Sequence, residues 1–505
     1  MTPPSSALAA SRLTNETRTA KSIAPYPSVP LGGHSHGLFL CDQERRSFHF
    51  FLTKTAPQLA GNFACVFWDH HLVQSAHHEP AIRHVIVALG SLHETFVRDA
   101  GVPVTSGTRA IHSPFALRQY LRAIRCLLPT TAPSLPVDVC LMSCVLFAAF
   151  EAMRGQYGCA ITHITSGLKI LGELRTSESS VDQWIALSTG RMPYVTINVL
   201  CGLFTRLEAQ AVVTVHNTSA SPLSLWPKLA IDLDRPVAFH SLAEAREMLE
   251  VYTYFYRQHS TAMRNQNKMM DSLTYMNPEA VTLHDTSLSL LARWSDALDR
   301  FLLETSASLT SRDHRGAAIL KLRKIDCFIV LDVLQFAEVT GAEESTLWDR
   351  YYSLFEQMVH LGESIVEYFC STGFLHVSSP SSLSPLPALP PTIFSLDLGI
   401  IGAMFNVATR CRDPCLRRRA LNVLRVASVQ EGVWNSVIVA AIAEKWIDIE
   451  EEGLGTVASC VDIPAAVRLS SFLPVFDIHQ RSAQIYYGRS SEINSENMRK
   501  EVLLW

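Results

Sequence analysis

The spacing of apolar side chains predicts α-helices along most of this 505-residue chain. Apolar residues recur mostly three or four positions apart, and this spacing places them on one face of a helix. We therefore expect three amphipathic helices, each with an apolar face that packs against the rest of the protein. Their stripes are Val85, Leu89, Leu92 and Phe96, then Leu291, Trp294, Leu298 and Leu302, and finally Trp434, Ile438, Ala441, Trp446 and Ile449.

The segment Cys140–Leu171, CLMSCVLFAAFEAMRGQYGCAITHITSGLKIL, predicts two helices joined by a short turn at Arg154 and Gly155. Its first half is too apolar for a helix with one face in water, and its apolar run stops at Glu151. A helix that spans a bilayer needs roughly 18 or more apolar residues. We therefore expect a buried helical hairpin and no membrane span.

Helix boundaries are marked elsewhere, whereas clear strand signals are not found. Ser241 and Glu244 have the spacing of a capping box, and Gly341 precedes a further candidate helix over Glu343–Tyr368. The sequence has no convincing alternating strands bounded by Asn-Gly or Asp-Gly turns. It therefore predicts an all-α fold, a compact bundle of about a dozen helices in antiparallel pairs.

The chain is expected to form one large helical domain over residues 38–490. Residues 1–37 are rich in Pro, Ser, Thr and Gly and predict a disordered leader. A Pro/Ser-rich loop is expected at residues 376–392, because prolines remove backbone donors and block a helix. Residues 491–505 are interpreted as a C-terminal tail.

Composition narrows the class of protein. The hydrophobic fraction of 48% is that of a globular protein, and the N-terminus lacks the apolar core of a signal peptide. The net charge is −4, whereas a dedicated nucleic-acid binder usually carries a strong basic patch or tail. Several of the 12 cysteines lie inside apolar helices, which suits a reducing compartment.

A relaxed glycine fingerprint, Gly453-Leu-Gly455, is the nearest approach to a nucleotide-binding motif. Such a site needs a strand before it and a helix after it. Here a predicted helix precedes it and ends in three carboxylates, Glu450 to Glu452, which would repel a pyrophosphate. We interpret the glycines as a turn at a helix C-terminus and expect no cofactor. A Gly-Lys-Ser/Thr phosphate loop and a Gly-x-Ser-x-Gly elbow are both absent from the sequence.

Histidines cluster early in the chain but lack a ligand framework. A His-x-His pair opens the metal site of some hydrolase barrels, where strands present both imidazoles and further ligands follow. In this chain the pair is His34 and His36, which lie in a glycine-rich leader, and no such strands are predicted. We therefore expect no metal at these residues: His34, His36, His70, His71, His77, His78, His84 and His93.

Two cysteine pairs have four-residue spacing: Cys140 with Cys144, and Cys411 with Cys415. We interpret the first pair as core packing on an apolar helix and the second as flanking a break between helices. A binuclear zinc cluster needs six closely spaced thiolates, and the first 60 residues contain only Cys41. No bound zinc is therefore expected.

Basic residues form two short runs. We interpret the triplet Arg417 to Arg419 of the longer run as the solvated first turn of a helix, with nuclear import or phosphate contact as the alternative. The longer run is Arg410, Arg412, Arg417, Arg418 and Arg419, and the shorter is Lys321, Arg323 and Lys324.

Several blocks, taken in order, resemble the helical regulatory region of fungus-specific transcription factors, which follows a zinc-cluster DNA-binding module in that family. The resemblance covers residues 40–490. The blocks are Ala116–Leu127, Cys140–Leu171, Ser241–Tyr252, Leu291–Leu302, Ala408–Leu424 and Glu431–Leu454.

This resemblance implies a nuclear transcription regulator of a filamentous fungus, often one encoded beside genes that make a secondary metabolite. It transfers no catalytic, cofactor-binding or metal-binding residue, so an enzyme is not expected. The sequence departs from the family where the zinc cluster should be, and we expect weak direct DNA binding at most. Expected partners are other transcription regulators or coregulators, with dimerisation left open.

Two other functions remain as alternatives. A helical scaffold would present a groove to peptides, as arrays of helical hairpins do. An enzyme would hold its site in a pocket between helices, and a metal-dependent hydrolase is the version to test first.

Overall fold

A computed structural model describes most of the chain. The chain divides into two units, Met1–Asp42 and Gln43–Trp505. Nearly all of the described residues belong to the second unit. The expected leader at 1–37 and the Pro/Ser-rich loop at 376–392 lie outside the described residues. Those residues are 39–99, 113–128, 136–174, 192–214, 237–254, 278–340, 343–371, 393–477, 482–489 and 499–504.

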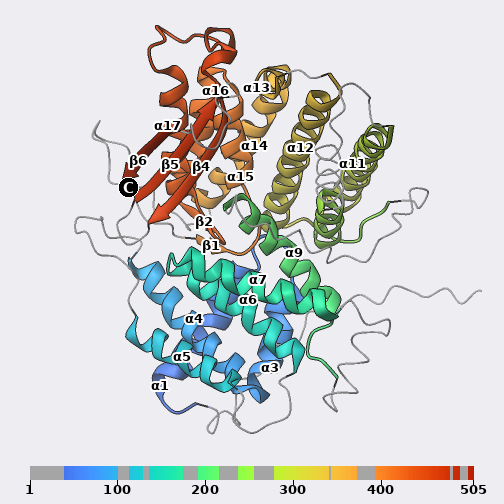
Figure 1. Ribbon diagram of the computed structural model, residues 1–505. Helices are drawn as coiled ribbons and strands as arrows, with labels where there is room; N and C mark the ends of the chain where they lie inside the picture. The colour runs from blue at the N-terminus through green and yellow to red at the C-terminus, as the bar shows by residue number, and fades with distance from the viewer. Residues whose placement is uncertain are drawn as a thin grey trace, which may run out of the picture. The chain divides into compact units, whose positions relative to one another are not determined.

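The described residues are mostly α-helical, as the sequence predicted (Figure 1). The N-terminal helices are α1 (Asp42–Phe50), α2 (Ala56–Leu59), α3 (Leu72–His78), α4 (Pro80–Asp99), α5 (Pro114–Leu127), α6 (Val137–Met153), α7 (Tyr157–Leu174) and α9 (Ile197–Thr214), with single π-helical turns at Phe51–Thr55 and Phe67–His71. The later ones are a helix over 242–254, α11 (Pro278–Thr305), α12 (Ser311–Thr340), α13 (Glu344–Leu347), α14 (Tyr352–Ser371), α15 (Ile401–Arg410), α16 (Pro414–Ala427) and α17 (Ser436–Glu451).

The helical hairpin predicted at Cys140–Leu171 is confirmed as α6 and α7, which pack against each other. Helix α6 is buried along almost its whole length and also contacts α4 and α9. The turn contains Gly155 at φ 77°, a backbone conformation that glycine adopts at no steric cost. On α7, a side chain at Gly167 would collide with the ring of Phe204 on α9, so glycine permits this close approach.

Two of the three predicted apolar stripes are confirmed, and the third is wrong in part. The stripes on α4 and α11 are buried or half-buried. On α17, Trp434 lies before the helix, in a short strand, and Ile438 and Ala441 are only half-buried. The buried face is rotated toward Val439, Ala440, Ala443, Trp446, Ile447 and Glu450. Because the charged residue Glu450 lies in the buried face, the pattern of apolar residues predicted the wrong position for that face.

A large apolar core lies among α11, α12 and α14 to α17, together with the helix over 242–254. Trp294 of α11 is nearly fully buried there, and its indole Nε1 donates a hydrogen bond of 2.8 Å to the carbonyl oxygen of Ala245. The capping box predicted at Ser241 is present in modified form. The hydroxyl of Ser241 accepts from the Glu244 amide at 3.2 Å, whereas Glu244 reaches back to the amide of His240 at 2.7 Å.

Two small β-sheets were not predicted. In the first, β1 (Ile393–Ser395) pairs in parallel with β2 (Val429–Glu431), which pairs antiparallel with β3 (Trp434–Asn435). The second is the antiparallel sheet β4 (Leu469–Asp477), β5 (Ser482–Arg489) and β6 (Arg499–Leu504), which contacts α17 through β6 (Figure 1).

The second sheet corrects the expectation of a C-terminal tail, because six residues of the expected tail form β6 and pair with β5. The strand signal was weak for a physical reason. Pro474 interrupts β4, and proline is tolerated there because β4 is an edge strand of the sheet.

Candidate functional site

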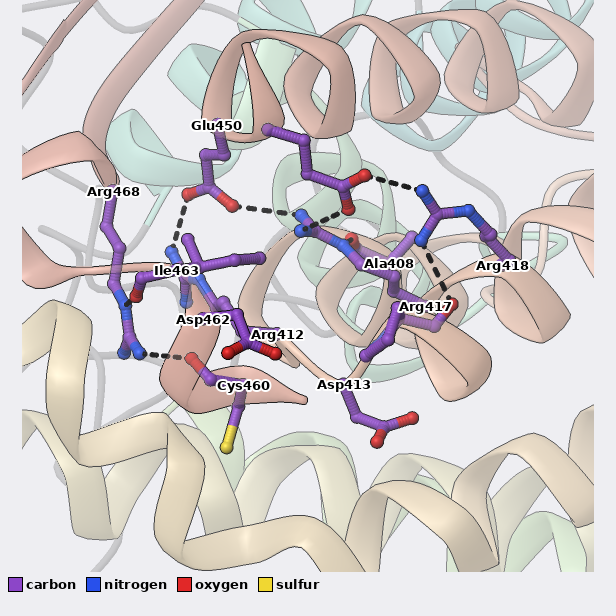
Figure 2. Close-up of polar contacts among 12 residues, drawn as sticks. Ala408, Arg412, Asp413, Arg417, Arg418, Glu450, Cys460, Asp462, Ile463 and Arg468 are labelled. Carbon is purple, nitrogen blue, oxygen red and sulfur yellow. Dashed lines mark hydrogen bonds and ion pairs between the residues drawn. The ribbon is translucent and has the colours of Figure 1, made fainter. Parts of the chain in front are cut away.

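The longer arginine run folds into a buried ion-pair network, which corrects the interpretation of a solvated helix turn (Figure 2). The side chains of Arg412 and Arg417 are both 0% exposed. Asp413 accepts the amides of Cys415 and Leu416 at 3.0 and 2.8 Å and so caps α16. The cap fixes where α16 starts, and this start turns Arg417 inward.

Glu450, on α17, is the centre of this network. Its two oxygens accept from Arg412 Nη2 and Arg417 Nη2, each at 2.9 Å. One of these oxygens also accepts the backbone amide of Leu469 at 3.0 Å, which ties β4 to α17. Burial acts to raise the pKa of Glu450, but the charges of Arg412 and Arg417 outweigh it and hold the pKa below its ordinary value. The carboxylate is therefore ionised and clamped between two guanidinium groups.

The other three arginines of the run also contact neighbouring side chains. Arg418 pairs with Glu451 at 2.5 Å, and Arg419 makes two hydrogen bonds to Glu363 of α14, at 3.0 and 2.8 Å. The guanidinium of Arg410 lies 5.3 Å from the ring centroids of both Trp348 and Trp446, within the range of cation–π contacts. Arg418, at 51% side-chain exposure, is the member of the run that matches the solvated interpretation.

The shorter basic run contributes to a second buried network. Arg323 of α12 pairs with Glu250 at 3.3 Å, and Arg206 of α9 pairs with the same carboxylate at 3.2 Å. Arg246 pairs with Asp397 at 3.0 Å. Arginines from three helices are thus held by two buried acids. No local pattern in the sequence marks this network, because its members are separated by up to about two hundred residues along the chain.

The histidines that the structure describes do not come together as a group of metal ligands. His84 Nδ1 lies 2.7 Å from Gln119 Oε1, and the two ring nitrogens of His93 lie 2.9 and 3.0 Å from Thr55 and Gln58. Burial lowers the pKa of His93 to about 4, so this imidazole is neutral. His34 and His36 lie outside the described residues. Within the part of the chain that the structure describes, no group of three or more His, Cys, Asp or Glu side chains could hold a metal ion.

The two cysteine pairs differ in burial and in their position relative to the helices. Cys140 and Cys144 both lie on α6 and are half-buried, which corrects their interpretation as core residues. Cys411 is buried at the C-terminus of α15, whereas Cys415 is exposed at the start of α16, so this pair spans a helix break as predicted. Cys41, the single cysteine of the first 60 residues, is exposed.

The glycine fingerprint is a helix end, as predicted. Helix α17 ends at Glu451, and Gly453 has φ 76° in the turn after it. The acidic triplet differs from the expectation, because Glu450 and Glu451 bind arginines and only Glu452 is exposed.

A groove of about 480 Å³ lies between α11, α12 and α14. Trp294, Leu298 and Leu361 are among its apolar lining residues, and Lys321 at its rim pairs with Asp299 at 2.9 Å. His360 of the lining lies 3.7 Å from Glu363, three residues further along α14.

None of the helices in the described residues combines the length and the apolar composition needed to cross a membrane.

Comparison with known proteins gives one informative match. The chain is 24% identical over 539 aligned positions to the aspercryptin biosynthesis cluster-specific transcription regulator of Emericella nidulans, and the alignment covers 92% of this chain and 82% of that protein. This chain is similar to a fungal transcription regulator over most of its length. No family model matches the sequence, and no solved structure matches it.

Proposed function

We propose that this chain is a nuclear transcription regulator of the fungal type and controls a gene cluster for a secondary metabolite. The observation that carries the proposal is the extent of the similarity, which runs through 92% of the chain and therefore includes the helical body. The name of the relative describes regulation of one biosynthetic cluster.

The finer part of the proposal is that the chain acts through its helical region and reaches promoters through a partner. DNA binding depends on cationic side chains that are free to meet phosphates. The arginine run, which was the best sequence candidate for such contact, is occupied by Glu450, Glu451 and Glu363. The net charge of −4 adds no long-range attraction to DNA.

Transcript profiling of a strain that lacks the gene tests the regulatory role. We expect the transcripts of one contiguous set of biosynthetic genes to change together in the deletion strain, and the wild-type gene to restore them. The comparison is made under conditions in which the chain is expressed. Unchanged transcripts across such clusters, with the metabolite profile also unchanged, would contradict the proposed function.

A further inference from the structure

Helix α5 has an apolar stripe that the described residues leave uncovered. Leu117, Leu121 and Leu128 are 38%, 44% and 59% exposed, and Ile124 between them is half-buried. Leu117, Leu121 and Ile124 are spaced four and three residues apart along one side of the helix, and Leu128 follows as the residue after the end of the helix. Neighbouring exposed apolar side chains that are rimmed by polar residues are typical of surfaces that bind another protein.

The stripe is not needed to hold α5 in place. Another face of the helix buries Ala116, Tyr120 and Ala123, and the Tyr120 ring stacks on Phe150 of α6 with centroids 4.4 Å apart. Gln119 adds a buried hydrogen bond of 2.7 Å to Glu44 of α1. The helix is therefore docked by one face while the neighbouring stripe remains available.

Two cationic side chains run along the outer edge of the stripe. Arg118 and Arg125 are seven residues apart, so they share one side of the helix, next to Leu121 on the side away from the buried face. Both are exposed, and neither side chain makes a hydrogen bond or an ion pair with any other residue that the structure describes. Arg122 differs, because it pairs with Glu44 at 3.2 Å.

We propose that this surface, Leu117, Leu121, Ile124 and Leu128 with Arg118 and Arg125, binds an acidic amphipathic helix of a partner protein. The apolar spacing fits the facing side of a second helix, and the two free guanidinium groups complement carboxylates along its edge. A second copy of α5 fits less well, because α5 contains no Asp or Glu to pair with the arginines, and in an antiparallel pair the arginines of the two copies would meet. The proposal rests on the proposed function and names the chemistry of the partner.

Fluorescence anisotropy with a synthetic peptide tests the surface on the full chain. The probe is a labelled helical peptide with leucines at intervals of four, three and four residues and glutamates beside them. We expect saturable micromolar binding that weakens about tenfold or more in Leu121→Asp and in the double variant Arg118→Glu with Arg125→Glu. A second peptide with lysines in place of the glutamates should prefer the charge-reversed variant over the wild type.

Matched controls come from α11, where Leu303 is 77% exposed and Arg300 is also exposed. Leu303→Asp and Arg300→Glu should bind the acidic peptide as the wild type does, and circular dichroism should show all variants folded. Three results would overturn the proposal: no binding or equal binding by all variants, a dimer in sedimentation that Leu121→Asp abolishes, or vesicle binding that the same variant abolishes. None of these bears on the transcript experiment, so the two proposals can fail separately.

Discussion

Replacement of Glu450 by glutamine should lower the free energy of unfolding by about 3–5 kcal/mol, because it leaves two buried arginines without their shared carboxylate. Arg412 and Arg417 have no exposure through which water could replace it. The remaining acid, Glu451, lies 3.5 Å from Arg417 and also serves Arg418. The variant is compared with the wild type by urea unfolding, followed by circular dichroism.

Two further variants make this result specific. Glu452 is exposed and lies two residues after Glu450, so Glu452→Gln should leave the unfolding midpoint unchanged. The triple variant Arg412→Met, Arg417→Met and Glu450→Met should recover most of the lost stability, because it removes all three buried charges together. Wild-type stability in Glu450→Gln alone would show that this network is not clamped as the structure describes.

Phe147→Asp should cost a similar amount, about 3–5 kcal/mol, since it combines the loss of a large buried ring with an unpaired buried charge. Phe147 is 5% exposed on α6, and its ring packs edge-on against Tyr120 at 5.0 Å. The substitution removes the contact of Phe147 with Tyr120 of α5 and also disrupts packing within the hairpin of α6 and α7. Thermal and urea unfolding measure the effect.

Thr165→Asp is the control for this prediction, because Thr165 is exposed on α7 and its hydroxyl bonds only within its own helix, to the carbonyl of Ile161. It should shift the melting temperature little. Equal melting temperatures for Phe147→Asp and the wild type would mean that the hairpin is not buried where the structure places it.

The sequence predicted those features that depend on short spacings. The hairpin of α6 and α7 and the apolar face of α4 follow from residues a few positions apart, and both are present. The face of α17 was misplaced because Glu450 occupies it, and a buried acid is acceptable only beside arginines that come from another part of the chain.

Long-range polar contacts could not be predicted from local patterns. The runs of charge were visible in the sequence, but their burial depends on how α15, α16 and α17 pack. Glu431 shows the same limit. It lies in β2, and its carboxylate accepts the amides of Gly399 and Ile400 at 2.9 and 2.8 Å, near the start of α15. Burial raises the pKa of Glu431 to about 7. Such a contact is set by topology, which local spacing does not encode.

The arginine run links the fold to the proposed mode of action. A run of five arginines within ten residues would ordinarily be interpreted as a surface for phosphates or for an import receptor. In this protein the run stabilises the junction of α15, α16, α17 and β4. In contrast, we propose that the exposed leucines and arginines of α5 bind a partner protein.

An electrophoretic mobility shift assay tests most directly the proposal that this chain does not act through its own contact with DNA. The purified full chain is incubated at physiological salt with promoter fragments of the genes whose transcripts respond to the deletion. We predict weak binding that scrambled DNA competes away and that added salt reduces, because the arginine run is held by Glu450, Glu451 and Glu363 and the net charge is −4, which leaves only non-specific contact with phosphates. Nanomolar binding to one sequence that survives an excess of scrambled competitor would contradict the claim.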